Sequence, residues 1–510
     1  MRAAVLDLGS NSFHVLVADV ADGRVVPVMR QREMLHLGAV VARHGDVPAD
    51  ALATAAATAG HLADLAHRSG AEQLTAVATA AIRDAGNGAE VLRAMEAATG
   101  VAVQVLPGLE EARLSYLGVR SAVAVDAEPL LVLDLGGGSL ELAVGRGAEV
   151  GWSASTPLGA SRLSALLEHD PPRDADLRHL RAAVADALDP LVAEVAAHAP
   201  AGVVAVGGTV RALARVLAAD DGRWLPADTV TNQFTMAVDA LRRMRDRLLE
   251  LDDAGRLDVP AMKDSRADHI HVAAVVLVEV FDRLGITQAT VADAGLREGI
   301  LLDAAAAEVV SASRLREREI ERVATTFLAA DDAHPEHVAT LAGLLFDELV
   351  DLHALGDDDR ELLQHAARLH TIGEALALRR SHRHGAYLLE HAELRGFAPA
   401  EVAALTTMVR FHGARGLDGK FPPAAGLDPA RRGRVERLLT LLQLADVLDA
   451  ARDQAVHDVH ADDDGRRVTV AVAGDPHLAA SDVERRAGWF RRVYDRDIRL
   501  VDAETGDELV

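Results

Sequence analysis

The chain has 510 residues, of which 50% are hydrophobic and 26% charged, and at about 100–200 residues per domain this length predicts roughly three domains. It contains no cysteine, which excludes disulfides, thiolate nucleophiles and Cys-ligated zinc or iron–sulfur sites. The formal net charge of −25 disfavours broad electrostatic binding of nucleic acid or of anionic membranes.

Sequence signals for nucleotide binding through a P-loop and for membrane insertion are missing. The only Gly-Lys pair, Gly419-Lys420, is followed by Phe421 instead of Ser or Thr. The N-terminus reaches Asp7 too early for a signal-peptide core, and no apolar run approaches the 18 or more residues of a membrane span. We therefore expect a soluble, cytoplasmic protein with no nucleic-acid or membrane partner. A phosphate-rich substrate would have to be captured locally, by backbone N–H groups, arginines and a divalent metal.

Strand and helix signals alternate over the first third of the chain. Three β-rich runs separated by Gly/Ser/Asn/Asp turns predict a meander, and a helix follows, entered by Pro48 and closed by Gly70. The predicted strands are residues 3–8, 13–20, 25–32, 74–80, 101–106 and 130–135, and the predicted helices are 48–68, 89–98 and 110–119.

The last of these strands opens an internal repeat. Residues 5–17 align with residues 132–144 at seven of thirteen positions, and the matches include the Asp-Leu-Gly-x-x-Ser turn. Chance matches of Val and Leu are easy in an apolar chain, but a matched polar turn between two strands is not. The pattern therefore predicts a duplicated α/β unit. Its second copy continues with a helix at 174–198, a strand at 203–206, a strand at 290–291 and a helix at 296–307.

The pattern changes beyond residue 309. Helical periodicity runs from residue 315 to about 452, and the tail shows a strand at 467–472, a helix near 481–494 and a strand at 498–501. We divide the chain into residues 1–123 and 124–308, the two halves of the duplicated core, 309–457, an all-α domain, and 458–510, a small α+β element.

The repeated turns suit phosphate binding. Glycines allow close approach of an anion to the backbone, whose consecutive N–H groups form a nest, and hydroxyls add donors. A pair of ordinary hairpin turns is the alternative, but a third Gly-Gly-Thr turn after another strand favours a cleft. The adjacent carboxylates Asp7, Asp134 and Glu141 are candidate ligands for Mg²⁺ or Mn²⁺. The candidate phosphate-binding residues are Gly9, Ser10, Asn11, Ser12, Gly136, Gly137, Gly138, Ser139, Gly208 and Thr209.

Four motifs in this order resemble the exopolyphosphatase/guanosine pentaphosphatase (Ppx/GppA) family. They are the segments 7–14, Asp-Leu-Gly-Ser-Asn-Ser-Phe-His; 108–113, Gly-Leu-Glu-Glu-Ala-Arg; 134–139 with Glu141; and 293–299, Asp-Ala-Gly-Leu-Arg-Glu-Gly. The resemblance covers residues 1 to about 308. It implies an actin-like (ASKHA, ribonuclease H-like) two-domain α/β core.

The resemblance also implies catalytic roles. It places the general base on Glu111, the second Glu of its motif, and assigns Arg83 to holding the terminal phosphate from the opposite side. The alternative for Glu111 is a solvated glutamate at a helix start, favoured by the helix dipole. Arg113 could serve the site or simply pair with Glu110.

The helical region carries residues in the order of the metal ligands of HD-type phosphohydrolases, namely His337, His370, His384, His412 and Asp446. Longer members of the family resemble this layout. The required His-Asp doublet reads His370-Thr371 here, and a hydroxyl cannot replace a bridging carboxylate. We therefore expect a degenerate HD-like domain without its own hydrolase activity. Buried structural histidines are the alternative. The candidate polyphosphate contacts are His370, His384, Arg410 and His412.

The resemblance predicts a hydrolase that releases terminal phosphate from inorganic polyphosphate, guanosine pentaphosphate or both. Two alternatives stay open: an ATP-dependent kinase of the same fold group, and a non-catalytic sensor of alarmone or polyphosphate. Glu111 argues against both, because a sensor does not need a base and a kinase has its base elsewhere. A homodimer stays open as well.

Overall fold

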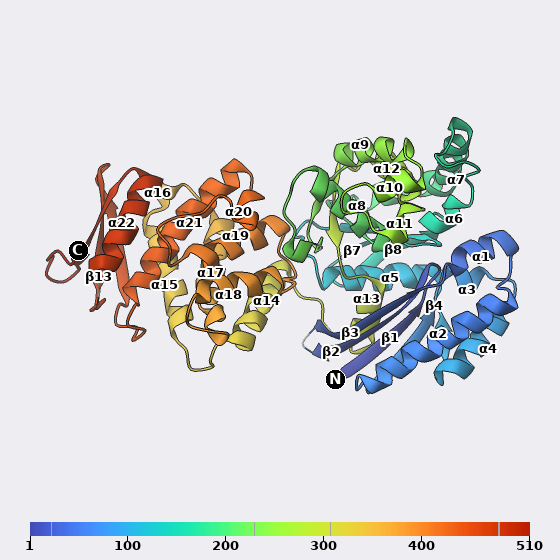
Figure 1. Cartoon of the computed structure of the whole chain (residues 1–510), viewed down its shortest axis with the longest axis horizontal. Coiled ribbons are helices and arrows are strands. Elements are labelled where there is room, and N and C mark those ends of the chain that lie inside the picture. Colours follow the sequence, from blue (N-terminus) through green and yellow to red (C-terminus); the bar gives the residue numbers. More distant parts are fainter. Residues whose placement is uncertain (22, 229, 307, 478–479) are drawn as a thin grey trace. The chain divides into compact units, whose positions relative to one another are not determined.

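We describe a computed structural model of the chain, which covers residues 1–21, 23–228, 230–306, 308–477 and 480–510 (Figure 1). The chain forms two compact units. The first contains Met1–Asp221 and Thr231–Leu315, and the second contains Gly222–Val230 and Arg316–Val510. Among the described residues, no helix is both long and apolar enough to cross a membrane.

The first half of the first unit is built on a five-stranded sheet in the order β3-β2-β1-β4-β5. Its central strand β1 is antiparallel to β2 and parallel to β4, so the meander expected from the sequence is confirmed. Both faces of β1 are buried: Leu6 and Leu8 pack with the alanine-rich helix α2, whereas Ala3 and Val5 face the opposite core. The strands are β1 (Arg2–Leu8), β2 (Ser12–Ala21), β3 (Arg24–Met34), β4 (Gln73–Ala78) and β5 (Val103–Val105).

The second half repeats this sheet. Its order is β10-β11-β9-β6-β7-β8, which matches the first sheet strand for strand apart from the extra antiparallel edge strand β10. The structure thus confirms the duplication. The strands are β6 (Leu130–Leu135), β7 (Leu140–Arg146), β8 (Glu149–Thr156), β9 (Gly202–Val206), β10 (Thr235–Ala237) and β11 (Gln288–Ala292).

Helices cover both sheets of the first unit. The sequence analysis predicted α2, α4, α5, α7 and α13 but made no prediction for α9 and α12, and the short helices have too few turns to show periodicity. They are α1 (Leu37–His44), α2 (Ala49–Arg68), α3 (Ala80–Asp84), α4 (Gly88–Thr99), α5 (Gly108–Arg120), α6 (Ala160–Ser164), α7 (Asp174–Ala197), α8 (Gly208–Asp220), α9 (Val238–Leu249), α10 (Asp253–Leu257), α11 (Asp264–Ala267), α12 (Ile270–Leu284) and α13 (Leu296–Ala304).

Several predicted boundaries differ from the structure, among them the end of one strand and the end of one helix. The strand predicted at 74–80 ends at Ala78, because Thr79 already precedes helix α3. The helix predicted at 296–307 ends at Ala304, and its predicted last residue, Ala307, lies outside the described residues.

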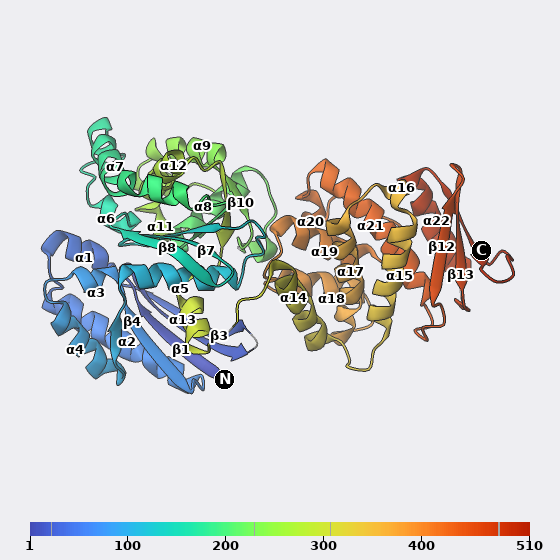
Figure 2. The same cartoon turned by 180° about the vertical axis from the view of Figure 1, so that it is seen from behind.

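Helices α5 and α13 cross between the two sheets (Figure 2). Their backbones touch: a side chain at Gly118 would overlap the backbone of Gly295, and one at Gly299 would overlap that of Leu114. These two glycine contacts hold the two halves at a fixed separation around the turns described below.

The second unit is helical and ends in a three-stranded sheet ordered β12-β13-β14. Val468, Val470 and Val472 of β13 alternate inward and join the same core as the helices, so the tail packs on the helical part. The predicted tail is confirmed, with β12 in addition. The elements are α14 (Ala312–Phe327), which begins at the end of the first unit, η1 (Pro226–Asp228), α15 (His334–Glu348), α16 (Val350–His353), α17 (Asp357–Leu369), η2 (Ile372–Ala375), α18 (Ser381–Glu390), α19 (Pro399–Phe411), α20 (Pro422–Ala425), α21 (Pro429–Leu448), α22 (Ala480–Tyr494), β12 (Asp458–Asp463), β13 (Arg467–Ala473) and β14 (Asp497–Asp502).

Candidate active site

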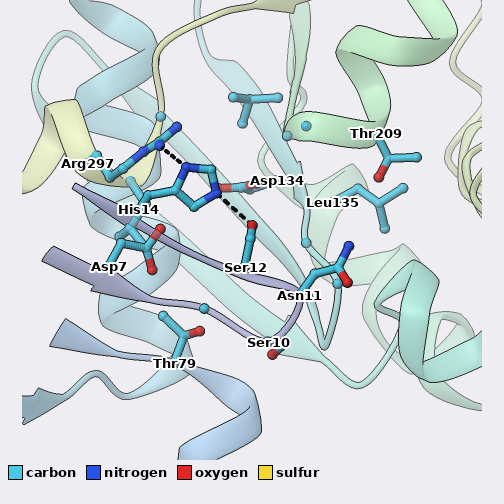
Figure 3. Close-up of a pocket in the computed structure, with 18 of the residues that line it drawn as sticks. Asp7, Ser10, Asn11, Ser12, His14, Thr79, Asp134, Leu135, Thr209 and Arg297 are labelled. Carbon is cyan, nitrogen blue, oxygen red and sulfur yellow. Dashed lines mark hydrogen bonds between the residues drawn. The ribbon is translucent and has the colours of Figure 1, made fainter. Parts of the chain in front are cut away.

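The turns of both halves meet at one cavity of about 180 Å³ in the first unit (Figure 3). It is lined by every predicted phosphate-binding residue, by the three predicted metal ligands and by Glu111. Arg83 is the one predicted residue of this unit that does not line it. Residues that are more than 200 positions apart in sequence therefore form one site.

The first two turns are packed against each other. Ser10 Oγ accepts a hydrogen bond of 3.1 Å from the backbone N–H of Ala81, which fixes the first turn against α3. A Cβ at Gly138 would lie 2.5 Å from Ser10 Oγ, and a Cβ at Gly137 would lie 3.1 Å from Cβ of Asn11. Glycine is therefore needed here for close approach, as well as for exposure of backbone N–H groups.

The third turn requires glycine for conformation. Gly207 has φ +124°, in the region that side chains disfavour, and a Cβ there would also overlap the carbonyl of Leu135. The turn leads into α8, where Thr209 Oγ1 accepts a 3.2 Å hydrogen bond from Arg266 Nη1.

Several buried carboxyl groups line the cavity. Loss of water, together with the negative charge of their neighbours, raises the pKa of Asp7 to about 6 and raises the pKa of Glu141 well above its usual value. Burial also raises the pKa of Asp134, which accepts a hydrogen bond from Ser115, while Ser155 donates to Glu141 at 3.0 Å. This crowding of acidic groups favours a cation among them.

One of these carboxylates and a neighbouring amide have polar atoms without a hydrogen-bond partner among the described residues. Asp7 Oδ1 and both amide atoms of Asn11 are buried and make no hydrogen bond. Buried polar atoms are paired in the great majority of cases, so these atoms are available to contact an ion, a ligand or ordered water. The oxygens of Asp7, Asp134 and Glu141 do not form a set within 4.8 Å of one another in the part of the chain that the structure describes. One ion cannot therefore contact all three without rearrangement.

Glu111 faces the cavity from the first turn of α5. Its side chain is 7% exposed, against 36% for Glu110, which pairs with Arg113 at 2.7 Å instead. This pair settles the choice left open for Arg113, which also contacts Asp303 at 2.9 Å. Burial raises the pKa of Glu111 to about 7, in spite of an adjacent arginine, and the negative charges of Asp7 and Asp134 add to the rise. A carboxylate with a pKa near 7 is well suited to accept a proton at neutral pH.

Arg83 lies beside the predicted base, and its predicted contact with the terminal phosphate stays a prediction. Its Nη1 donates to Glu111 Oε1 and, at 2.8 Å, to the carbonyl oxygen of Leu106. Its Nη1 is thus engaged with the predicted base, and the side chain is not part of the cavity lining.

A cationic side of the site was missed by the sequence analysis. Arg297 Nη1 donates to His14 Nδ1 at 2.6 Å, and because that nitrogen accepts, the proton of the neutral ring is on Nε2, which donates to Ser12 Oγ at 2.7 Å (Figure 3). Burial and nearby arginines hold the pKa of His14 well below its usual value, so the ring is neutral. Both residues lie inside motifs 7–14 and 293–299, which was the available signal.

Further arginines extend this side. Arg32, Arg211 and Arg266 line the cavity, and burial and mutual repulsion lower the pKa of Arg266 to about 10. Exposed Lys263 lies close enough for Arg215 and these three arginines to lower its pKa. The result is a concentrated positive region in an acidic protein.

In the second unit, the histidine predictions need correction. His370 has no exposed surface, so it cannot contact a polyphosphate chain as predicted. Burial lowers the pKa of His412 to about 4, so this half-buried ring carries no charge to attract phosphate. His337, placed first among the ordered histidines, lies outside the cluster formed by His334, His370 and Asp446.

The remaining two candidates are at a surface. His384 and Arg410 are half-buried, and both act electrostatically on His382 together with Arg380 and Arg383, lowering its pKa. This group is cationic, so contact with polyphosphate stays a prediction for His384 and Arg410.

Comparison with known proteins agrees with the geometry. The chain is 34% identical over 305 residues to an uncharacterised protein of Streptomyces coelicolor, covering 59% of this chain and 90% of the relative. Among solved structures it is similar to an exopolyphosphatase from Cytophaga hutchinsonii, with 25% identity and a TM-score of 0.56, covering 61% of this chain and all of that one. An exopolyphosphatase-like protein gives 28% identity and a TM-score of 0.55, covering 60% of this chain and 98% of its own.

Family models account for most of the chain. The model of the Ppx/GppA phosphatase family matches residues 16–308, and the model of its domain III matches residues 315–478. A Ppx/GppA member from Aquifex aeolicus is similar in structure as well, with 25% identity and a TM-score of 0.52 over 60% of this chain and 98% of that one. These matches agree with the duplicated core and with its two Gly/Ser turns. The chain belongs to the Ppx/GppA phosphatase family.

Proposed function

We propose that the protein hydrolyses the terminal phosphoanhydride bond of inorganic polyphosphate, of guanosine pentaphosphate, or of both. The observation that carries this proposal is one cavity that is lined both by buried carboxyl groups, one of them with a pKa of about 7, and by arginines. We call the carboxyl groups of Asp7, Glu111, Asp134 and Glu141 the acidic wall, and the side chains of Arg32, Arg211, Arg266 and Arg297 the cationic wall. Hydrolysis of a phosphoanhydride needs both kinds of side chain. Anionic oxygens must be held while an attacking water loses its proton.

The acidic wall fits Mg²⁺ or Mn²⁺. The cation would offset the repulsion between carboxylates that contributes to the raised pKa values of Asp7 and Glu141. It would also give Asp7 Oδ1, which has no hydrogen-bond partner, a group to contact. Hard cations of this kind prefer oxygen ligands and keep several waters, so Asp134 and Glu141 can act directly while Asp7 acts directly or through water. When bound, the ion would neutralise phosphate charge.

The protein groups divide the chemistry between them. The carboxylate of Glu111 accepts a proton from water, whose oxygen forms the new P–O bond as the bridging P–O bond breaks and the shortened chain leaves as an anion. Backbone N–H groups of the Gly/Ser turns and the arginine side chains hold the anionic oxygens. Arg83, paired with Glu111, orients that carboxylate in the free enzyme.

The cationic wall supports an extended polyanion as substrate. Beyond the cavity lining, Arg215 and Lys263 continue the positive region, so phosphates behind the terminal one would also meet positive charge.

In the second unit the order His334, His370, Asp446 supports an HD-like origin. Thr371, in place of the doublet's aspartate, argues against a second hydrolytic centre.

The test is phosphate release from long-chain polyphosphate and guanosine pentaphosphate, assayed in parallel with Mg²⁺ and with the Glu111→Gln variant as control. We expect release from at least one substrate, and a sharp loss in the variant. Release from neither substrate contradicts the proposal. Transfer of phosphate from ATP to an added acceptor without hydrolysis would support the kinase alternative, and tight binding without turnover would support the sensor.

A further inference from the structure

A buried cluster in the second unit brings together two histidines and an aspartate from three helical elements. His334 begins α15, His370 follows α17, and Asp446 lies near the end of α21. Ligand atoms of these three side chains all lie within 4.8 Å of one another. His370 is completely buried, the His334 side chain is 3% exposed, and that of Asp446 is 20% exposed.

Hydrogen bonds assign the protonation of both rings. His334 Nδ1 lies 2.7 Å from the buried carboxylate of Asp449, and His370 Nδ1 lies 2.5 Å from the carbonyl oxygen of Ala367. Both partners are acceptors, so each Nδ1 carries a proton and each neutral ring presents a bare Nε2. The same holds for the neighbouring ring of His412, whose Nδ1 faces the Val409 carbonyl oxygen at 2.8 Å.

The two bare nitrogens face each other and a carboxylate oxygen. His334 Nε2 and His370 Nε2 are 3.2 Å apart, and Asp446 Oδ1 lies 3.7 Å and 3.5 Å from them. With both rings neutral, three acceptors thus converge with no donor among them. One shared proton could join the two nitrogens, but it would leave Asp446 Oδ1 beyond ordinary hydrogen-bonding distance. A metal ion would satisfy all three.

We propose that His334, His370 and Asp446 form a site for one divalent transition metal, with Zn²⁺ as the preferred occupant and water in the fourth position. With metal–ligand distances of about 2.0–2.1 Å, ligand atoms at tetrahedral angles are about 3.3 Å apart, close to the spacing found here. Imidazole and carboxylate ligands without thiolates suit zinc among the common divalent ions. The proposal does not depend on the phosphatase proposal for the first unit.

The surroundings of the cluster are those of a metal centre. A ligating histidine usually donates its other ring nitrogen to a carboxylate or a backbone carbonyl, and both arrangements occur here. The second oxygen of Asp446 accepts a 3.1 Å hydrogen bond from Arg486, which leaves Oδ1 for the ion. Bound metal would join α15, the end of α17 and α21, and so stabilise the helical core.

The test is Zn²⁺ binding to the full-length protein after removal of metal by a chelator, followed by equilibrium dialysis with metal analysis and by thermal unfolding. The parent protein for this test carries Glu141→Gln, so that the first unit contributes less to the measured metal binding. We expect one tightly bound Zn²⁺ per chain. Zinc at 100 times its dissociation constant should raise the folding equilibrium constant of the second unit about 100-fold.

Four variants locate the ion. His334→Gln and Asp446→Asn should each weaken zinc binding by more than about 100-fold. Asp449→Asn leaves the three ligands in place but changes the carboxylate that accepts from His334, and should weaken binding by about 10–100-fold. His337→Gln, on the same helix but outside the cluster, is the matched control and should bind normally. Asp446→Asn conserves volume, so it tests the site even if the histidine variants fail to fold.

Absence of tight zinc binding to the folded parent protein would overturn the proposal. So would zinc binding that persists unchanged in folded Asp446→Asn, since the ion would then be elsewhere. Loss of binding in the Asp446 variant with retention in the His337 variant would support it.

Discussion

The two halves of the duplicated core share a backbone but differ in chemistry. The pairing of Asp7 with His14 in the first hairpin is matched by that of Asp134 with Glu141 in the second. At this equivalent position the first half has a neutral histidine bound to Arg297, whereas the second has a buried glutamate bound to Ser155. Duplication thus supplied two similar turns, each with a buried aspartate. At the equivalent neighbouring position the first half binds an arginine through His14, whereas the second half adds a further carboxylate, Glu141.

The largest expected effect comes from Glu111, which belongs to the acidic wall without being part of either turn. Glu111→Gln keeps the volume of the side chain but removes the proton acceptor, so we expect hydrolysis to slow by about 10²–10⁴-fold while substrate binding is retained. Glu110→Gln is the matched control, because its side chain points away and pairs with Arg113. Single-turnover rates with polyphosphate measure the difference. A comparable loss at Glu110 would mean that the base is the other carboxylate.

The acidic wall itself is tested by Glu141→Gln. Even a group that only orients a metal ligand contributes about 10–100-fold to metal affinity, so loss of this carboxylate should raise the Mg²⁺ concentration needed for half-maximal activity by at least that factor. Glu149→Gln, on the exposed end of strand β8, is the control. An unchanged Mg²⁺ dependence would remove Glu141 from the ion's ligands.

The cationic wall is tested by Arg297→Met. A hydrogen bond to a charged group contributes about 1.5–3 kcal/mol, which predicts a KM for polyphosphate about 10–150-fold higher and a smaller change in kcat. Arg113→Met removes an arginine of similar exposure that pairs with Glu110 and Asp303 outside the cavity. If both variants raise KM equally, the effect comes from the overall charge of the protein, and a specific role of Arg297 in binding the substrate is contradicted.

The smallest expected effect is the change in activity with pH near neutrality. The general base must be deprotonated, and Glu111 in the free enzyme has a pKa raised to about 7, mainly by burial. Activity should therefore be nearly constant above pH 8 and fall about tenfold per unit well below pH 7. Bound cation would move this limb to lower pH. A kcat/KM profile of the parent that stays flat down to pH 5 would contradict the role of Glu111.

The turns and their carboxylates could be predicted from sequence because each is a local pattern. A strand, an aspartate and a Gly/Ser turn are contiguous, and their repetition at a fixed offset identified both. The cationic wall could not be predicted in this way. Arg32, Arg211 and Arg266 come from separate elements, and nearly all basic residues of this chain are arginines, so none stands out by type.

The histidine cluster shows a second limit of sequence reasoning. Order along the chain suggested His337, whereas the structure uses His334, almost one helical turn earlier on α15. Histidines at these two positions are equally plausible in sequence. Which one faces His370 depends on how the first turn of α15 is directed against α17 and α21, and that is decided by tertiary packing.

The near absence of lysine has a practical consequence at the cationic wall. Lys263 and Lys420 carry the only side-chain amines in the chain, and Lys263 is exposed with its pKa lowered, chiefly by Arg215. A lowered pKa leaves more of the amine unprotonated and nucleophilic at neutral pH, so acylating reagents should modify Lys263 faster than Lys420. A polyanion bound beside it would reverse that shift and slow acylation. The ratio of the two labels, read by peptide mass spectrometry, would then report occupancy of the cavity even in variants that no longer turn over.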